Sequence, residues 1–145
     1  MPEGVWSEYP IEVVWEGGKR YRGGKPGGPT HLVDGERQVA PSPVEGMLVA
    51  LGACSSIDVV EILEKRRTPP TSLSVRVDFA RAPTPPRRLT AARLVFRVAT
   101  ASERPHVERA IQLSFEKYCS VATSLAPDTV LEWSLELVGP EETAR

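Results

Sequence analysis

The chain has 145 residues, of which 41% are apolar and 26% charged, a composition that fits one globular domain and excludes a disordered chain. Its formal net charge of −1 gives no overall field that would attract nucleic acid or a membrane surface. The first ten residues lack a basic start and an apolar stretch, and no apolar run approaches the roughly 20 residues of a membrane span, so we expect a cytoplasmic protein.

The first third of the chain reads as short strands joined by turns. Apolar residues alternate with glutamates from Ile11 to Glu16, which predicts a half-buried strand. The glycine-rich segment 17–28 predicts a turn, a short strand and a connection. Residues 30–35 predict a third short strand that ends at the turn signal Asp34-Gly35.

A long helix is predicted to follow, because its start is marked by three residues. Ser42 suits the cap position, Pro43 the first helical position, and Glu45 completes a capping box three residues after Ser42. The apolar residues that follow cover more than one helix face, which indicates a central helix. Pro69 and Pro70 end it.

The second half predicts two more strands, a second helix and a last strand. Alternation over 73–79 and 92–98 predicts an antiparallel hairpin with a long connection. Ser102 is the predicted cap of a helix whose apolar face runs from Val107 to Tyr118, and a short extra helix is predicted after it. Alternation over 131–137 predicts the final strand. Strands grouped around single long helices predict one α+β domain over 1–145 with a mostly antiparallel sheet.

Several common site signatures are missing from the sequence. It contains no dinucleotide-binding or P-loop glycine motif and no nucleophile-elbow motif. Two cysteines 65 residues apart and two isolated histidines, His31 and His106, do not make a zinc site. We therefore expect neither a metal nor a cofactor. The absence of Asn, with 14 prolines and 14 Arg against 4 Lys, is typical of a thermophile, although GC-rich codon usage gives part of the same bias.

The two cysteines carry the strongest candidate chemistry. In a reducing compartment a cysteine pair is more often redox-active or inert than a permanent crosslink. Cys54 lies in the middle of the long helix, with Asp58 four residues later on the same face and in need of a partner. Cys119 follows the second helix, where a break would place it at a new helix N-terminus whose exposed amides would lower its pKa. Taken alone, Cys54 would more often be a residue that fills core space than a reactive thiol.

The segments SPVEGMLVALGACSSIDVVEILEK and RAIQLSFEKYCSVATSL together resemble the OsmC/Ohr family of osmotically inducible and organic hydroperoxide resistance proteins, in its OsmC-like branch. The resemblance extends over nearly the whole chain and implies an intertwined homodimer with sites at the subunit interface. It also implies a peroxidase in which Cys54 attacks the peroxide and Cys119 resolves the product as a disulfide. A dithiol reductant, thioredoxin-like or lipoyl-type, would then restore both thiols.

The chain departs from the family pattern at two further site positions. The hydroperoxide resistance branch has a functional Glu directly after the Pro, whereas here Val44 takes that place and Glu45 follows. In an ideal helix Glu45 and Cys54 point to opposite sides, about 13 Å apart along the axis, so Glu45 either meets a partner chain's Cys54 or only caps the helix. The family's thiolate-holding arginine has three candidates, Arg20, Arg22 and Arg37, of which we select Arg37 because it lies in the loop before the helix.

Three functions remain open at this level. The first is a thiol-dependent peroxidase for organic hydroperoxides. The second is a redox-sensing or small-molecule-binding protein of the same fold that does not catalyse a reaction. The third is a hot-dog-like thioesterase, which the second long helix disfavours.

Overall fold

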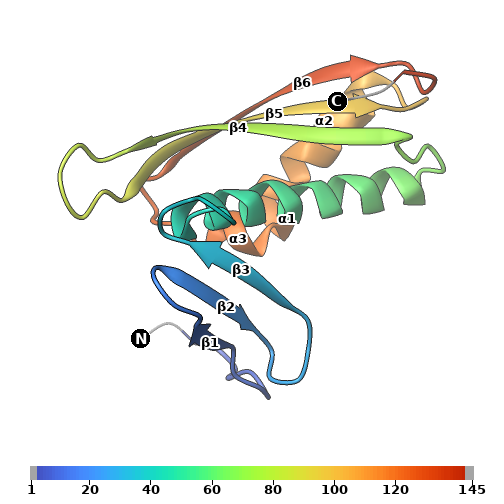
Figure 1. Cartoon of the computed structure of the whole chain (residues 1–145). Coiled ribbons are helices and arrows are strands. Elements are labelled where there is room, and N and C mark those ends of the chain that lie inside the picture. Colours follow the sequence, from blue (N-terminus) through green and yellow to red (C-terminus); the bar gives the residue numbers. More distant parts are fainter. Residues whose placement is uncertain (1–2, 143–145) are drawn as a thin grey trace. The chain divides into compact units, whose positions relative to one another are not determined.

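The computed structural model describes residues 3–142 (Figure 1). The elements follow the order predicted from the sequence. In chain order they are β1 Glu12–Trp15, β2 Arg20–Gly24, β3 Thr30–Asp34, α1 Pro43–Lys65, β4 Ser72–Arg81, β5 Leu89–Ala99, α2 Arg104–Leu113, the π-helical turn η1 Ser114–Tyr118, α3 Ser120–Thr123 and β6 Val130–Val138. The chain forms two compact units, one up to Met47 and one from Leu48 onward. The α+β class is confirmed, whereas a single domain over 1–145 stays a prediction.

The N-terminal unit is built on one antiparallel sheet and the first turn of α1. Its strands lie in the order β1-β2-β3, so that His31 is on an edge strand. The predicted capping box is present, because the Ser42 N–H donates to Glu45 Oε1 at 2.9 Å and the Glu45 N–H donates to Ser42 Oγ at 3.2 Å. Two otherwise unpaired amides are satisfied reciprocally, and α1 begins at Pro43 for the reason that the sequence indicated.

Asp34 organises the loop that leads from β3 towards α1. Its buried carboxylate accepts the N–H groups of Glu36, Gln38 and Val39 at 2.9–3.1 Å, and Arg20 lies 3.7 Å away. The Glu36 amide contributes most to lowering the pKa of Asp34; burial opposes it, and the other two amides and Arg20 add to it. The charged form of Asp34 therefore holds this loop in place.

The protection of this loop is expected to depend on pH through Asp34. Because the pKa of Asp34 is lowered in the folded state, its charged form stabilises the loop fully above the ordinary Asp pKa of about 3.9. This stabilisation is lost as the pH falls through the folded-state pKa. Hydrogen exchange of the three accepted amides, corrected for intrinsic rates, should accelerate between about pH 4 and pH 2 in the wild type. The Asp34→Asn variant should exchange faster at pH 6 and show little change in that window. An equal acid response in both proteins would contradict this role.

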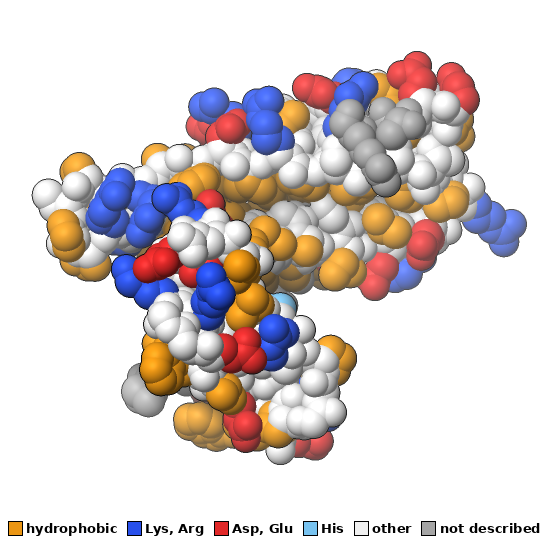
Figure 2. All heavy atoms as spheres, viewed as in Figure 1, with side chains coloured by type: hydrophobic (Ala, Val, Ile, Leu, Met, Phe, Trp, Pro, Cys, Tyr) orange, Lys and Arg blue, Asp and Glu red, His pale blue; other side chains and the backbone are white. Residues whose placement is uncertain are grey.

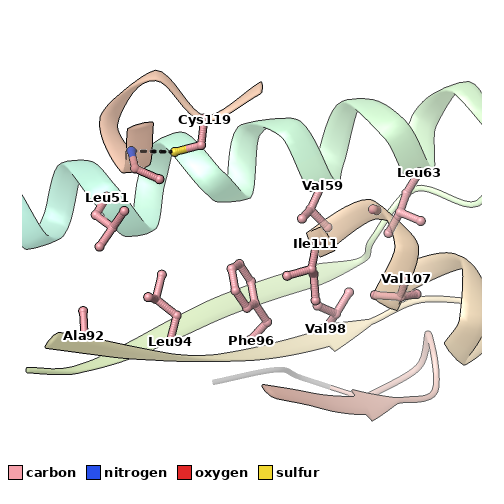
Figure 3. Close-up of a cluster of buried hydrophobic side chains, with 12 residues drawn as sticks. Leu51, Val59, Leu63, Ala92, Leu94, Phe96, Val98, Val107, Ile111 and Cys119 are labelled. Atoms are coloured by element: carbon pink, nitrogen blue, oxygen red, sulfur yellow. Dashed lines mark hydrogen bonds between the residues drawn. The ribbon is translucent and has the colours of Figure 1, made fainter. Parts of the chain in front are cut away.

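The C-terminal unit packs α1 and α2 against one face of the second sheet (Figure 1). Its strands lie in the order β4-β5-β6, with β4 and β5 antiparallel as predicted and β6 parallel to β5. The core sits between the helices and this sheet, as Figure 3 shows for side chains from α1, α2 and β5. Phe96 on the central strand is fully buried, and its ring meets Phe115 edge-on at a centroid distance of 6.2 Å.

Two expectations about the helices need correction. Ser102 does not cap the second helix: Glu103 occupies the cap position without a side-chain hydrogen bond, and the buried Ser102 Oγ has no partner among the described residues. The Ser102 backbone is instead held by Thr100 Oγ1, which accepts its N–H at 3.1 Å. The helix is α-helical only to Leu113, after which η1 makes a wider turn before Cys119.

The expectation that no apolar segment approaches a membrane span was also wrong. By length and composition alone α1 could cross a bilayer, since an 18-residue window of it has a mean hydropathy of 1.8. The many Val, Leu and Ile side chains of α1 keep the hydropathy high. A core helix of a soluble protein passes the same test, and Leu51, Val59 and Leu63 of α1 are buried in the core of the C-terminal unit.

Candidate functional site

The two cysteines come together in the C-terminal unit. Cys54 lies on α1 and is partly exposed, whereas Cys119 is fully buried, and both are free thiols. After burial, which is the larger cause, the neighbouring Cys54 side chain also raises the pKa of Cys119. Cys54 also packs against the core cluster that contains Cys119. The structure thus brings a partly exposed thiol and a buried one into the same packed cluster.

Cys119 lies where the helix breaks, as the sequence predicted. It is the cap residue of α3, and its Sγ accepts the Ala122 N–H at 3.4 Å (Figure 3). The expected lowering of its pKa is wrong, however. Burial raises the pKa of Cys119, Cys54 adds to the rise, and the amides of Ala122 and Val121 only oppose it. Burial removes the water that would hydrate the thiolate. This destabilises the charged form more than the two backbone amides stabilise it.

The partner of Asp58, which the sequence left open, is Ser114. The fully buried Ser114 hydroxyl donates to Asp58 Oδ2 at 2.7 Å and lies 3.3 Å from the carbonyl oxygen of Ser55. Sequence reasoning placed Ser114 on the apolar face of the second helix and missed this role. A small polar residue at a core-facing position was the only signal for it.

The remaining predicted site residues lie in the N-terminal unit, where each has a partner. Glu45 is engaged in the capping box, and the Ser42 amide contributes most to lowering its pKa, while the charge of Arg37 adds to it. Arg22 pairs with Glu16 at 3.1 Å. Arg20 has Asp34 at 3.7 Å, as described above. The roles of Glu45 and Arg37 at the thiols therefore stay predictions.

Within residues 3–142 no group of three or more His, Cys, Asp and Glu side chains lies close enough together to hold a metal ion. A groove of about 470 Å³ lies on the C-terminal unit, and Asp58 and Tyr118 are among its lining residues.

Comparison with known proteins places both cysteines inside a recognised domain. Residues 34–134 match a family described as OsmC-like protein. Protein YhfA of Escherichia coli K12 is 39% identical over 128 residues, which cover 87% of this chain and 96% of YhfA. A hypothetical protein of Aquifex aeolicus VF5, of known crystal structure, is 25% identical, with a TM-score of 0.82 over 94% of this chain and all of that one.

A more distant structure shares the fold. The organic hydroperoxide resistance protein OhrB of Bacillus subtilis superposes with a TM-score of 0.59 at 13% identity, over 91% of this chain and all of that one. At that identity the likeness concerns the fold alone. The match over 34–134 and the relationship to YhfA are sufficient to conclude that the chain belongs to the OsmC-like protein family.

Proposed function

We propose that this protein is a thiol-dependent peroxidase that reduces organic hydroperoxides through Cys54 and Cys119. The observation that carries the proposal is that a partly exposed thiol packs against the core cluster that contains a fully buried one. Membership in a redox-related family supports it, as does the shared fold of a protein named for organic hydroperoxide resistance. The accessible Cys54 takes the part of the attacking thiol, and the buried Cys119 resolves the product.

The proposed reaction has three balanced steps. The Cys54 thiolate attacks the hydroperoxide ROOH, the O–O bond breaks, and the alcohol ROH leaves with a solvent proton while Cys54 becomes a sulfenic acid. The Cys119 sulfur then displaces hydroxide from the Cys54 sulfur, which gives a disulfide and water. An external dithiol reduces that disulfide by exchange and is itself oxidised. Because Cys54 packs against an apolar cluster, we expect organic hydroperoxides to be preferred over hydrogen peroxide.

A homodimer is part of the proposal. Beyond its core-facing residues, α1 leaves a stripe of apolar side chains exposed at i, i+4 and i+8, namely Val49, Ala53 and Ile57. Val49 and Ile57 are 62% and 57% exposed. Figure 2 shows hydrophobic side chains gathered on the C-terminal unit along the face where α1 runs. An apolar helix stripe of this kind is typical of a surface that a second subunit covers.

The test is consumption of an organic hydroperoxide in the presence of a dithiol such as dihydrolipoamide or reduced thioredoxin. Sustained turnover with either dithiol supports the proposal. A second candidate, a redox sensor without turnover, is favoured by the raised pKa of Cys119, which slows resolution. For a sensor, one equivalent of peroxide per chain would be consumed and the dithiol would not restore activity at a useful rate.

Resolution by Cys119 is expected to accelerate with pH beyond the ordinary thiol range. Its pKa is raised, so the thiolate fraction still grows where an unperturbed thiol, with a pKa of about 8.5, levels off. Disulfide formation after a single addition of peroxide, followed by rapid quenching and mass spectrometry, should speed up roughly tenfold per pH unit up to about pH 9. A plateau at or below about pH 8.5, where an unperturbed thiol levels off, would contradict the raised pKa.

A further inference from the structure

Ser114 is hydrogen-bonded to both segments that carry the cysteines of the C-terminal unit. Its hydroxyl reaches Asp58 Oδ2 at 2.7 Å and the Ser55 carbonyl oxygen at 3.3 Å, both on α1 within about one turn of Cys54. Its own carbonyl oxygen accepts the Cys119 N–H at 2.7 Å. Ser114 thus links the helix that carries Cys54 to the backbone of Cys119.

The π-helical turn makes this link possible. The bond from the Cys119 N–H to the Ser114 carbonyl spans five residues instead of four, so Cys119 is rotated by about 100° from its place in a continuous α-helix. Such turns are rare and are often found at functional sites. Here the wider turn ends at Cys119, whose side chain lies in the core cluster against which Cys54 packs.

The bond to Asp58 is the stronger of the two hydroxyl contacts. A hydroxyl has one proton, and the shorter contact to a charged carboxylate takes most of it. Asp58 is partly buried and lines the groove of about 470 Å³ together with Tyr118, which is the residue before Cys119. The charge-assisted bond holds Ser114, and through Ser114 the turn that ends at Cys119.

We propose that Ser114 and Asp58 are positioning residues that hold Cys119 against Cys54 and so set the effective concentration of the thiol pair for disulfide formation. This inference rests on the proposed function in that it requires the two thiols to form a disulfide. Neither residue touches the peroxide. Their contribution is to keep two sulfurs in a near-attack arrangement, which raises the rate and the equilibrium of ring closure.

The experiment measures the disulfide equilibrium without peroxide. The whole protein is equilibrated in mixtures of reduced and oxidised glutathione, the free thiols are alkylated, and the disulfide is quantified by mass spectrometry. Two protein thiols lose two electrons and two protons, and one oxidised glutathione becomes two reduced ones. The ratio at half oxidation gives the effective concentration of the pair.

Loss of the bridge should lower that effective concentration. We expect a fall of roughly tenfold for Ser114→Ala and for Asp58→Ala, since a hydrogen bond to a charged group is lost. Asp58→Asn retains an acceptor of about half the strength and should fall only roughly threefold. A general loss of packing would not produce this graded effect of Asn and Ala at position 58. Asp58 lies at a partly exposed site, so its variants remain informative if Ser114→Ala does not fold.

Ser55→Ala is the matched control. Ser55 is as buried as Ser114, but its hydroxyl bonds only to carbonyl oxygens of its own helix, those of Leu51 and Gly52, among the described residues. It should leave the glutathione ratio at half oxidation unchanged. Equal shifts in Ser55→Ala and Ser114→Ala would overturn the inference. Absence of any disulfide in the wild type would overturn it together with the proposed thiol cycle, whereas a wild-type disulfide without peroxide turnover would count against the peroxidase alone.

Discussion

Replacing Cys54 by serine is expected to reduce peroxide consumption by about a thousandfold or more, to the background rate of the dithiol. A serine hydroxyl in place of the attacking thiolate has no comparable nucleophilicity at neutral pH, and removing a nucleophile typically costs several orders of magnitude. The measurement is the decrease of an organic hydroperoxide with time at a fixed dithiol concentration. Rates that are equal in the wild type and in Cys54→Ser would rule out the proposed function.

The variant Cys119→Ser is the matched control, because it keeps the attacking thiol and removes the resolving one. It should consume one equivalent of peroxide per chain and then stop, with Cys54 carrying one added oxygen that a sulfenic acid reagent traps. These roles follow from burial: the partly exposed Cys54 is accessible to peroxide from solvent, whereas Cys119 is fully buried. Reversed behaviour of the two variants would exchange their assigned roles.

Elements with strong local signals could be predicted from the sequence. The capping box at Ser42 and Glu45 fixed the start of α1, and the alternation of β4 and β5 indicated both strands and their antiparallel pairing. These features depend on hydrogen bonds and burial patterns within a few residues. The pairing of Cys54 with Cys119 came from the family resemblance and stays a prediction, and Cys54 packs against the core cluster that contains Cys119.

What could not be predicted depends on contacts between distant segments. The parallel pairing of β6 with β5 is a consequence of how the chain returns after α3, which alternation alone does not encode. The π-helical turn arises where Ser114 bonds to α1, while the spacing of Phe115 and Tyr118 fits an ordinary α-helix. The direction of the Cys119 pKa shift depends on burial in the core, and the helix end that the sequence revealed has the weaker effect.

The core side chain with the largest expected effect on stability is Phe96. Its ring is fully buried on the central strand β5, and it meets Phe115 of η1 edge-on with an interplanar angle of 79°. Phe96→Ala should lower the free energy of unfolding by about 3–5 kcal/mol, because it removes a large apolar side chain and leaves a cavity. The midpoint of thermal unfolding should fall by roughly 10–20 °C.

The control for Phe96 is Phe79→Ala on the neighbouring strand β4, where the side chain is 46% exposed. The same atoms are removed, but little of their surface is buried in the described chain, so we expect a loss of about 1 kcal/mol or less. Urea unfolding of both variants at one protein concentration separates them, since association would add a concentration-dependent contribution. Similar losses of stability in the two variants would show that the core of the C-terminal unit is not centred on Phe96.

Phe96→Ala should also lower the effective concentration of the thiol pair if it loosens η1, because Phe115 and the Ser114 carbonyl belong to the same turn.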